Sequence, residues 1–125
     1  MEIVNASGAS EAIGPYCHAV RTGNLLLCSG QIPINPEAGK IVAEDVGGQA
    51  EQVFANIRAV LAEVGLGLSN VVKTTVFLAD MADFPTVNAI YAEAFGDHKP
   101  ARSTVQVAGL PLGSLVEIEC IAEFS

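Results

Sequence analysis

Arg102 is the residue best suited to bind a negatively charged small molecule. It is one of three arginines in the chain and begins a strand-like segment directly after Pro100-Ala101. A guanidinium in such a position binds a carboxylate through two parallel hydrogen bonds. The other two arginines, Arg21 in a turn and Arg58 on a helix with acidic neighbours, are expected to be solvated. The sequence therefore offers one place where a carboxylate could be held.

Glu117 is the expected chemical partner of Arg102. Side chains alternate between the two faces of a strand, so Glu117 and Glu119 share one face of the last strand-like segment, 116–124. Three residues of segment 102–108 also share a face: Arg102, Thr104 and Gln106. The simplest arrangement pairs the two segments antiparallel and places these three side chains on the same side as Glu117. Glu117 could then hold the guanidinium or activate a water molecule as a general base.

The same residues also have a purely structural interpretation. Arg102 and Glu117 would form an ion pair, within one chain or across a subunit boundary, because ion-pair networks produce similar clusters. Glu119 and Glu123 would belong to a solvated face. Tyr16, which follows Gly14-Pro15, would be a core aromatic with a solvated hydroxyl. Spacing alone leaves both interpretations open.

No other residue group predicts a metal ion or a cysteine nucleophile. His18 and His98 are the only histidines, and they are too few and too far apart to form a metal-ligand set. Each cysteine lies in an apolar run without a C-x-x-C motif, which predicts buried, unreactive thiols in a reducing compartment. The three cysteines are Cys17, Cys28 and Cys120.

Six strands and two helices are expected to position these side chains. The strand candidates are segments 2–5, 16–20, 25–29, 71–79, 102–108 and 116–124. Apolar residues at three- and four-residue spacing predict one helix from Val46 to Val64 and another over 84–95, with Asp83 as its N-cap. Segment 30–36 is rich in breakers and predicts a loop. Two amphipathic helices cover one face of one sheet. Residues 1–125 therefore predict a single α+β domain, a two-layer sandwich of a six-stranded mixed sheet with two helices on one face.

The composition of the chain disfavours several classes of binding partner. The 125 residues include 14 acidic and 6 basic ones, for a net charge of −8, which disfavours nucleic acids and anionic membranes. No apolar run reaches the roughly 18 residues of a membrane span, and residues 1–10 do not resemble a signal peptide. We expect a cytoplasmic protein. Only 16% of residues are charged and 50% are hydrophobic, which indicates that some surface is buried against another copy.

Taken together, short motifs along the whole chain closely resemble the RidA family, also called YjgF/YER057c/UK114. The motifs are Ile13-Gly14-Pro15-Tyr16, Ser29-Gly30-Gln31-Ile32-Pro33, Val72-Lys73-Thr74-Thr75-Val76-Phe77-Leu78, Val87-Asn88, Pro100-Ala101-Arg102-Ser103 and Val116-Glu117-Ile118-Glu119. The resemblance implies a chorismate-mutase-like fold and a homotrimer with ligand clefts between subunits. It further implies hydrolysis of reactive enamines and imines, such as 2-aminoacrylate, 2-iminopropanoate and 2-iminobutanoate, to 2-keto acids and ammonia without a cofactor.

The resemblance also assigns roles to individual residues. Arg102 matches the carboxylate-binding arginine and Glu117 the carboxylate that positions water, and Tyr16 matches the site tyrosine. Gly30, after Ser29, matches the glycine whose backbone faces the ligand. Asn88 and Phe84 match positions near the cleft. Thr104 stands where many members have cysteine, so a role that needs a thiol is absent while a hydroxyl contact with substrate stays possible.

Two other functions compete with deamination. The first is a trimeric protein that binds carboxylates without turnover, using the same arginine. The second is ribonuclease or translation-inhibitor activity, which is also attached to the family name but is disfavoured by the net charge of −8, since RNA binding normally needs a basic groove.

Overall fold

One sheet of six strands forms the back layer of the structure, in the spatial order β1-β2-β3-β8-β6-β7. The computed structural model describes all residues, 1–125. Neighbouring strands are antiparallel, except that β6 and β7 are parallel. The strands are β1 (Glu2–Val4), β2 (Ala19–Thr22), β3 (Leu25–Gln31), β6 (Val71–Leu78), β7 (Ala101–Gln106) and β8 (Val116–Glu123). The last strand in the chain therefore lies between β3 and β6, near the centre of the sheet.

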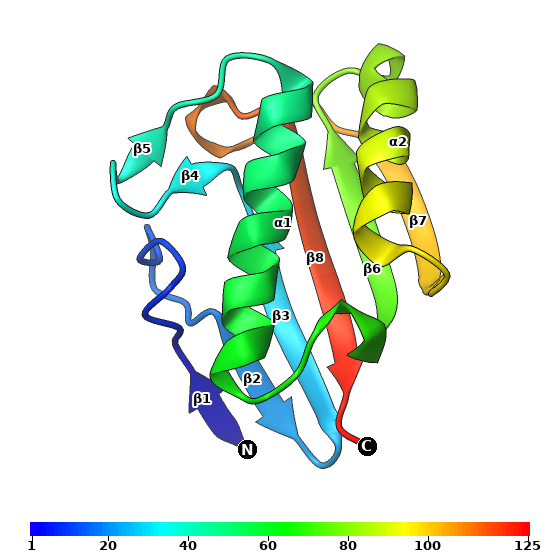
Figure 1. Ribbon diagram of the computed structural model, residues 1–125. Helices are drawn as coiled ribbons and strands as arrows, with labels where there is room; N and C mark the ends of the chain where they lie inside the picture. The colour runs from blue at the N-terminus through cyan, green and yellow to red at the C-terminus, as the bar shows by residue number, and fades with distance from the viewer.

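Two helices, α1 (Val46–Glu63) and α2 (Phe84–Phe95), cover one face of this sheet (Figure 1). The predicted architecture and both helices are confirmed. Asp45 caps α1, with its carboxylate accepting a hydrogen bond from the Gly48 amide at 2.7 Å. Gly65 and Gly96 follow the two helices with φ of 76° and 61°, a conformation that glycine adopts without strain. Neither helix is long and apolar enough to cross a membrane.

Asp83 occupies the N-cap position of α2, as predicted, but its side chain makes no capping hydrogen bond. Its own backbone is already helical, with φ −82° and ψ −5°, whereas a capping residue is normally extended. Asp80 instead accepts from the Ala82 amide and caps the short 3-10 turn Met81–Asp83 that precedes the helix.

The core lies between the sheet and the helices. The inward face of β8 is fully apolar and buried, as its alternation predicted, and consists of Val116, Ile118, Cys120 and Ala122. The largest side chain buried against it is Phe54 of α1. Cys28 and Cys120 are free, buried cysteines that lie directly opposite each other on β3 and β8.

The predicted pairing of segments 102–108 and 116–124 is wrong. β7 pairs with β6 at the edge of the sheet, and β6 separates β7 from β8. Arg102 pairs with Thr74, whose side chain is buried beneath the helices, so Arg102 faces the helices. Glu117 pairs with Phe77 on the opposite face. Consecutive strands are often neighbours, but here α2 carries the chain from β6 to a parallel β7, and β8 must return to the centre.

Segment 30–36 is not only a loop. β3 continues to Gln31, and β4 (Ile34–Asn35) forms a separate small hairpin with β5 (Lys40–Ile41). The buried amide of Asn56 on α1 donates to the carbonyls of Ile32 and Ile34 at 3.2 and 2.9 Å. These bonds fix the segment to the helix layer even though prolines interrupt it.

The second face of the sheet is covered by no element of the chain. Ile3, Leu27 and Val105 expose 61%, 40% and 41% of their side chains there. Exposed apolar side chains on an uncovered sheet face indicate a surface that another chain can bury. This face is the place where a second copy could pack.

Candidate functional site

The predicted site residues form two groups on opposite faces of the sheet. The first, the arginine cluster, lies where α2 packs on the edge strand β7. Its members are Phe84, Asn88, Tyr91, Arg102 and Thr104. The second, the carboxylate pocket, opens on the face away from the helices. It is a hollow of about 400 Å³ lined by Ile13, Tyr16, Ser29, Gly30, Pro111 and Glu117.

The arginine cluster holds the Arg102 guanidinium from one side. Phe84, Asn88 and Tyr91 are four and three residues apart on α2, so they form one stripe of that helix, which faces β7. Asn88 Oδ1 accepts from Arg102 Nη1 at 2.8 Å. The guanidinium carbon lies 4.6 Å from the Tyr91 ring centroid and 5.5 Å from that of Phe84. Arg102 itself remains exposed, so its other N–H groups can bind a ligand.

Thr104 carries a buried hydroxyl oxygen without a hydrogen-bond partner in the chain. It follows Arg102 by two residues and therefore shares its face of β7. A buried hydroxyl left unpaired is destabilising by about 1–3 kcal/mol and is uncommon in folded proteins. A ligand beside Arg102 would reach this oxygen only after the Thr104 side chain rotates, because the oxygen is not accessible to solvent.

The carboxylate pocket is built where the loop before β2 meets the ends of β3 and β8. Ser29 Oγ donates to the Cys17 carbonyl at 2.7 Å, so its hydroxyl ties β3 to the segment that carries Tyr16. Tyr16 is 47% exposed, which makes its interpretation as a core aromatic wrong. Its ring and the Glu117 carboxylate line the same hollow.

Gly30 leaves room for the Glu117 carboxylate. A Cβ added at Gly30 would overlap Glu117 Oε2 and would lie 2.9 Å from the carboxyl carbon. We expect Gly30→Ala to displace this carboxylate and lower kcat about 100-fold, because misplacing a reacting group by about 1 Å has effects of that size. Steady-state kinetics with an imino acid measure the loss. Gly67→Ala is the matched control, since a Cβ there meets nothing within 4 Å. Equal kcat values for the two variants would contradict the expectation.

Burial raises the pKa of Glu117, and the negative charge of Glu119 raises it further. If the ionised Glu117 acts as a base, activity rises with pH through this raised pKa. We expect Glu119→Gln to remove the charge contribution, lower the pKa of Glu117 and move the acid limb of the pH–rate profile to lower pH. Glu123→Gln is the control, since it removes the same charge farther along the same face of β8. An acid limb that stays in place or moves to higher pH would refute this role of Glu119.

Within one chain the arginine cluster and the carboxylate pocket cannot contact each other, because the sheet separates them. Arg102 and Glu117 therefore form no ion pair in the protomer, and the intrachain version of the structural interpretation is wrong. The predicted side-by-side arrangement of Thr104 with Glu117 fails for the same reason. Each face of the protein carries part of the expected site.

Comparison with known proteins identifies the family of this chain. A model of the Endoribonuclease L-PSP family matches residues 7–124. This chain belongs to that family, the RidA family. Reactive Intermediate Deaminase A, chloroplastic, of Arabidopsis thaliana is 51% identical over 97% of this chain and 65% of that protein. The 2-iminobutanoate/2-iminopropanoate deaminase of Escherichia coli strain K12 is 47% identical over 95% of this chain and 94% of that protein.

The RidA fold is also found in the solved structures. A crystal structure of E. coli TdcF with bound serine superposes with a TM-score of 0.94 at 41% identity, and each chain covers 100% of the other. The chorismate-mutase-like sandwich implied by the motifs is therefore confirmed.

Sequence reasoning missed Tyr91 and Thr74 of this RidA protein. Their side chains share a hydrogen bond of 2.7 Å directly beneath Arg102. In the sequence, Tyr91 belongs to the apolar stripe that predicts the helix over 84–95, which by itself gives no sign of a role beside Arg102. Its spacing from Phe84 and Asn88 was the available signal, because all three lie on the stripe that faces β7.

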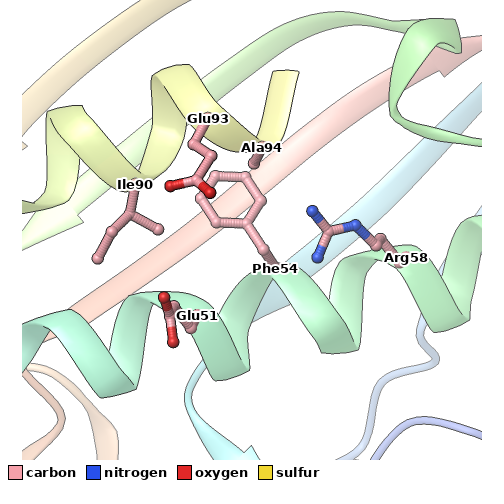
Figure 2. Close-up of a pocket in the computed structure, with 6 residues that line it drawn as sticks. All are labelled: Glu51, Phe54, Arg58, Ile90, Glu93 and Ala94. Atoms are coloured by element: carbon pink, nitrogen blue, oxygen red, sulfur yellow. The ribbon is translucent and has the colours of Figure 1, made fainter. Parts of the chain in front are cut away.

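A further hollow of about 310 Å³ lies between the two helices, on the side away from the sheet. Figure 2 shows its lining: Glu51, Phe54 and Arg58 come from α1, and Ile90, Glu93 and Ala94 come from α2. None of the predicted site residues lines this hollow. Arg58 lies on a different surface from Arg102 and can therefore serve as a control for substitutions of Arg102.

Proposed function

We propose that this protein hydrolyses small 2-imino acids and their enamine tautomers to 2-keto acids and ammonia. 2-Iminopropanoate and 2-iminobutanoate are the substrates we expect, and the reaction makes it a hydrolase acting on a carbon–nitrogen bond. The observation that carries this proposal is the exposed Arg102 guanidinium, oriented by Asn88 and two aromatic rings. The deaminase names of the Arabidopsis and E. coli relatives support it. We also propose a cytoplasmic location.

The active site is proposed to form between copies of the chain. The arginine cluster of one protomer would face the carboxylate pocket of the next, in a homotrimer closed by cyclic symmetry. Two observations support this assembly: the two groups lie on opposite faces of one chain, and the second face of the sheet exposes apolar side chains. An ion pair between Arg102 and Glu117 across this boundary could exist when no substrate is bound.

The proposed chemistry needs only these two groups and water. Arg102 binds the substrate carboxylate, and Thr104 would donate its hydroxyl to the same ligand after its side chain rotates toward it. Glu117, near the Gly30 backbone, takes a proton from the water that attacks the imine carbon. The imine is attacked in its N-protonated form, so the first product is a neutral carbinolamine. Glu117 then returns its proton to the carbinolamine nitrogen and takes the hydroxyl proton as the carbon–nitrogen bond breaks, which releases ammonia and leaves the carbonyl of the keto acid. Tyr16 lines the pocket and offers a hydroxyl donor to the nitrogen. No cofactor takes part.

A trapping experiment tests the activity. Threonine dehydratase or an amino-acid oxidase releases the imine, and semicarbazide captures it as an adduct. We expect this protein to suppress adduct formation and to speed release of the 2-keto acid. No suppression with small or bulky substrates, together with retained carboxylate binding, would favour the non-catalytic binding protein instead. RNA cleavage that survives purification and disappears in Arg102→Ala would favour the ribonuclease.

A further inference from the structure

Tyr91 and Thr74 connect the Arg102 guanidinium to the buried core. Thr74 is the residue of β6 directly opposite Arg102, and its side chain is 1% exposed. Its hydroxyl shares the 2.7 Å hydrogen bond with the Tyr91 hydroxyl. The Tyr91 ring therefore lies between a fixed anchor on β6 and the guanidinium, whose carbon is 4.6 Å from the ring centroid.

Packing fixes the Tyr91 ring from its other sides. Phe54 contacts it edge-on at a centroid distance of 5.8 Å, and Phe95 lies 4.7 Å away. Tyr91 is only 8% exposed. Burial raises the pKa of Tyr91 despite the opposing effects of Thr74 and Arg102, so the phenol keeps its proton and its hydrogen bond to Thr74. The aromatic ring is thus held more firmly than the arginine it supports.

We propose that Tyr91 is a positioning residue, held by Thr74, that orients the Arg102 guanidinium for the carboxylate of the substrate. This role rests on the function proposed above. It concerns the binding of the substrate carboxylate and not the chemical step. An exposed arginine has many rotamers, and ordering it on binding weakens affinity. The Asn88 hydrogen bond and the Tyr91 ring restrict those rotamers in advance. Water activation at Glu117 takes place on the other face and does not depend on Tyr91.

The test measures carboxylate binding separately from turnover. Calorimetry with 2-oxobutanoate, the keto acid of the proposed reaction, gives Kd for the full-length protein. We expect Tyr91→Leu to weaken binding about tenfold, within the range of a lost cation–π contact. Tyr91→Phe keeps the ring and loses only its anchor, so we expect a two- to threefold effect. Thr74→Val should weaken binding by the same factor as Tyr91→Phe. The double variant of Tyr91→Phe and Thr74→Val should bind no more weakly than either single variant, because both changes remove the same hydrogen bond.

Phe124→Leu is the matched control, because it removes an aromatic ring beside a different arginine, Arg21, whose guanidinium carbon lies 3.7 Å from the ring centroid. We expect its Kd to stay within twofold of the parent. In turnover, Tyr91→Leu should raise KM while leaving kcat nearly unchanged. The positioning role is overturned if Tyr91→Leu binds like the parent, or if Phe124→Leu weakens binding equally.

The two proposals fail in different ways. A parent protein that binds 2-oxobutanoate but does not hydrolyse the imine would overturn the proposed function, while the order of the variants would still support the role of Tyr91. Hydrolysis by the parent with no difference between Tyr91→Leu and Phe124→Leu would overturn the positioning role alone. A parent that neither binds nor hydrolyses would overturn both.

Discussion

Arg102→Ala is expected to reduce kcat/KM for a small 2-imino acid by about 100-fold or more. Removing one partner of a hydrogen-bonded charge pair raises the binding free energy by about 2–5 kcal/mol. Arg102 is exposed, so its loss should leave the fold intact. Initial rates of keto acid release measure the effect on kcat/KM, and a thermal melt tests whether the variant is still folded.

Arg58→Ala is the control for this prediction. It removes the same charge from the hollow between α1 and α2, away from both groups of site residues (Figure 2). We expect its kcat/KM to equal that of the parent. Normal imine hydrolysis by Arg102→Ala would remove the basis of the proposed mechanism.

Mixing two inactive variants should restore activity if each active site is shared between copies. Arg102→Ala lacks the cation, and Glu117→Gln lacks the base, so each variant alone is expected to be inactive. In a trimer assembled at random from equal amounts of both, about a quarter of the sites combine an intact Arg102 with an intact Glu117. Co-expression should therefore return about a quarter of the parental kcat, measured per protomer.

The same mixture tests the alternative geometry directly. If one chain supplied both groups, every protomer in the mixture would lack one of them and activity would stay absent. Assembling the variants separately and mixing them only after folding is the control, since preformed oligomers that do not exchange should remain inactive. Sedimentation of the co-expressed sample must show one species of the same size as the parent.

Local sequence patterns predicted most of this fold because burial controls them. The stripe from Val46 to Val64 had to face a core, and the alternation of β8 had to separate Ile118 from Glu117. The partner of β7 could not be read in the same way. An edge strand is half-exposed on both faces, so alternation groups Arg102 with Thr104 without showing which layer they face. Val105, although apolar, is 41% exposed on the face away from the helices.

The sequence singled out the residues of the candidate site but did not predict how they are arranged. Residue types singled out Arg102 and Glu117, and the structure places Arg102 beside the aromatic rings of α2 and Glu117, half-buried, in the carboxylate pocket. Their separation by the sheet depends on a parallel crossover through α2, which is a long-range property of the chain. The small β4–β5 hairpin was missed because its strands are two residues long and depend on bonds from Asn56.

The central position of β8 has a consequence for how the protein can fold during synthesis. Residues 116–123 join β3 to β6, so the two halves of the sheet have no common strand until the last of these residues leaves the ribosome. Until then, the edges of β3 and β6 expose unpaired backbone groups, which makes a nascent chain prone to aggregation. A chain that stops before Val116 would therefore lack the centre of the sheet and not merely a peripheral strand.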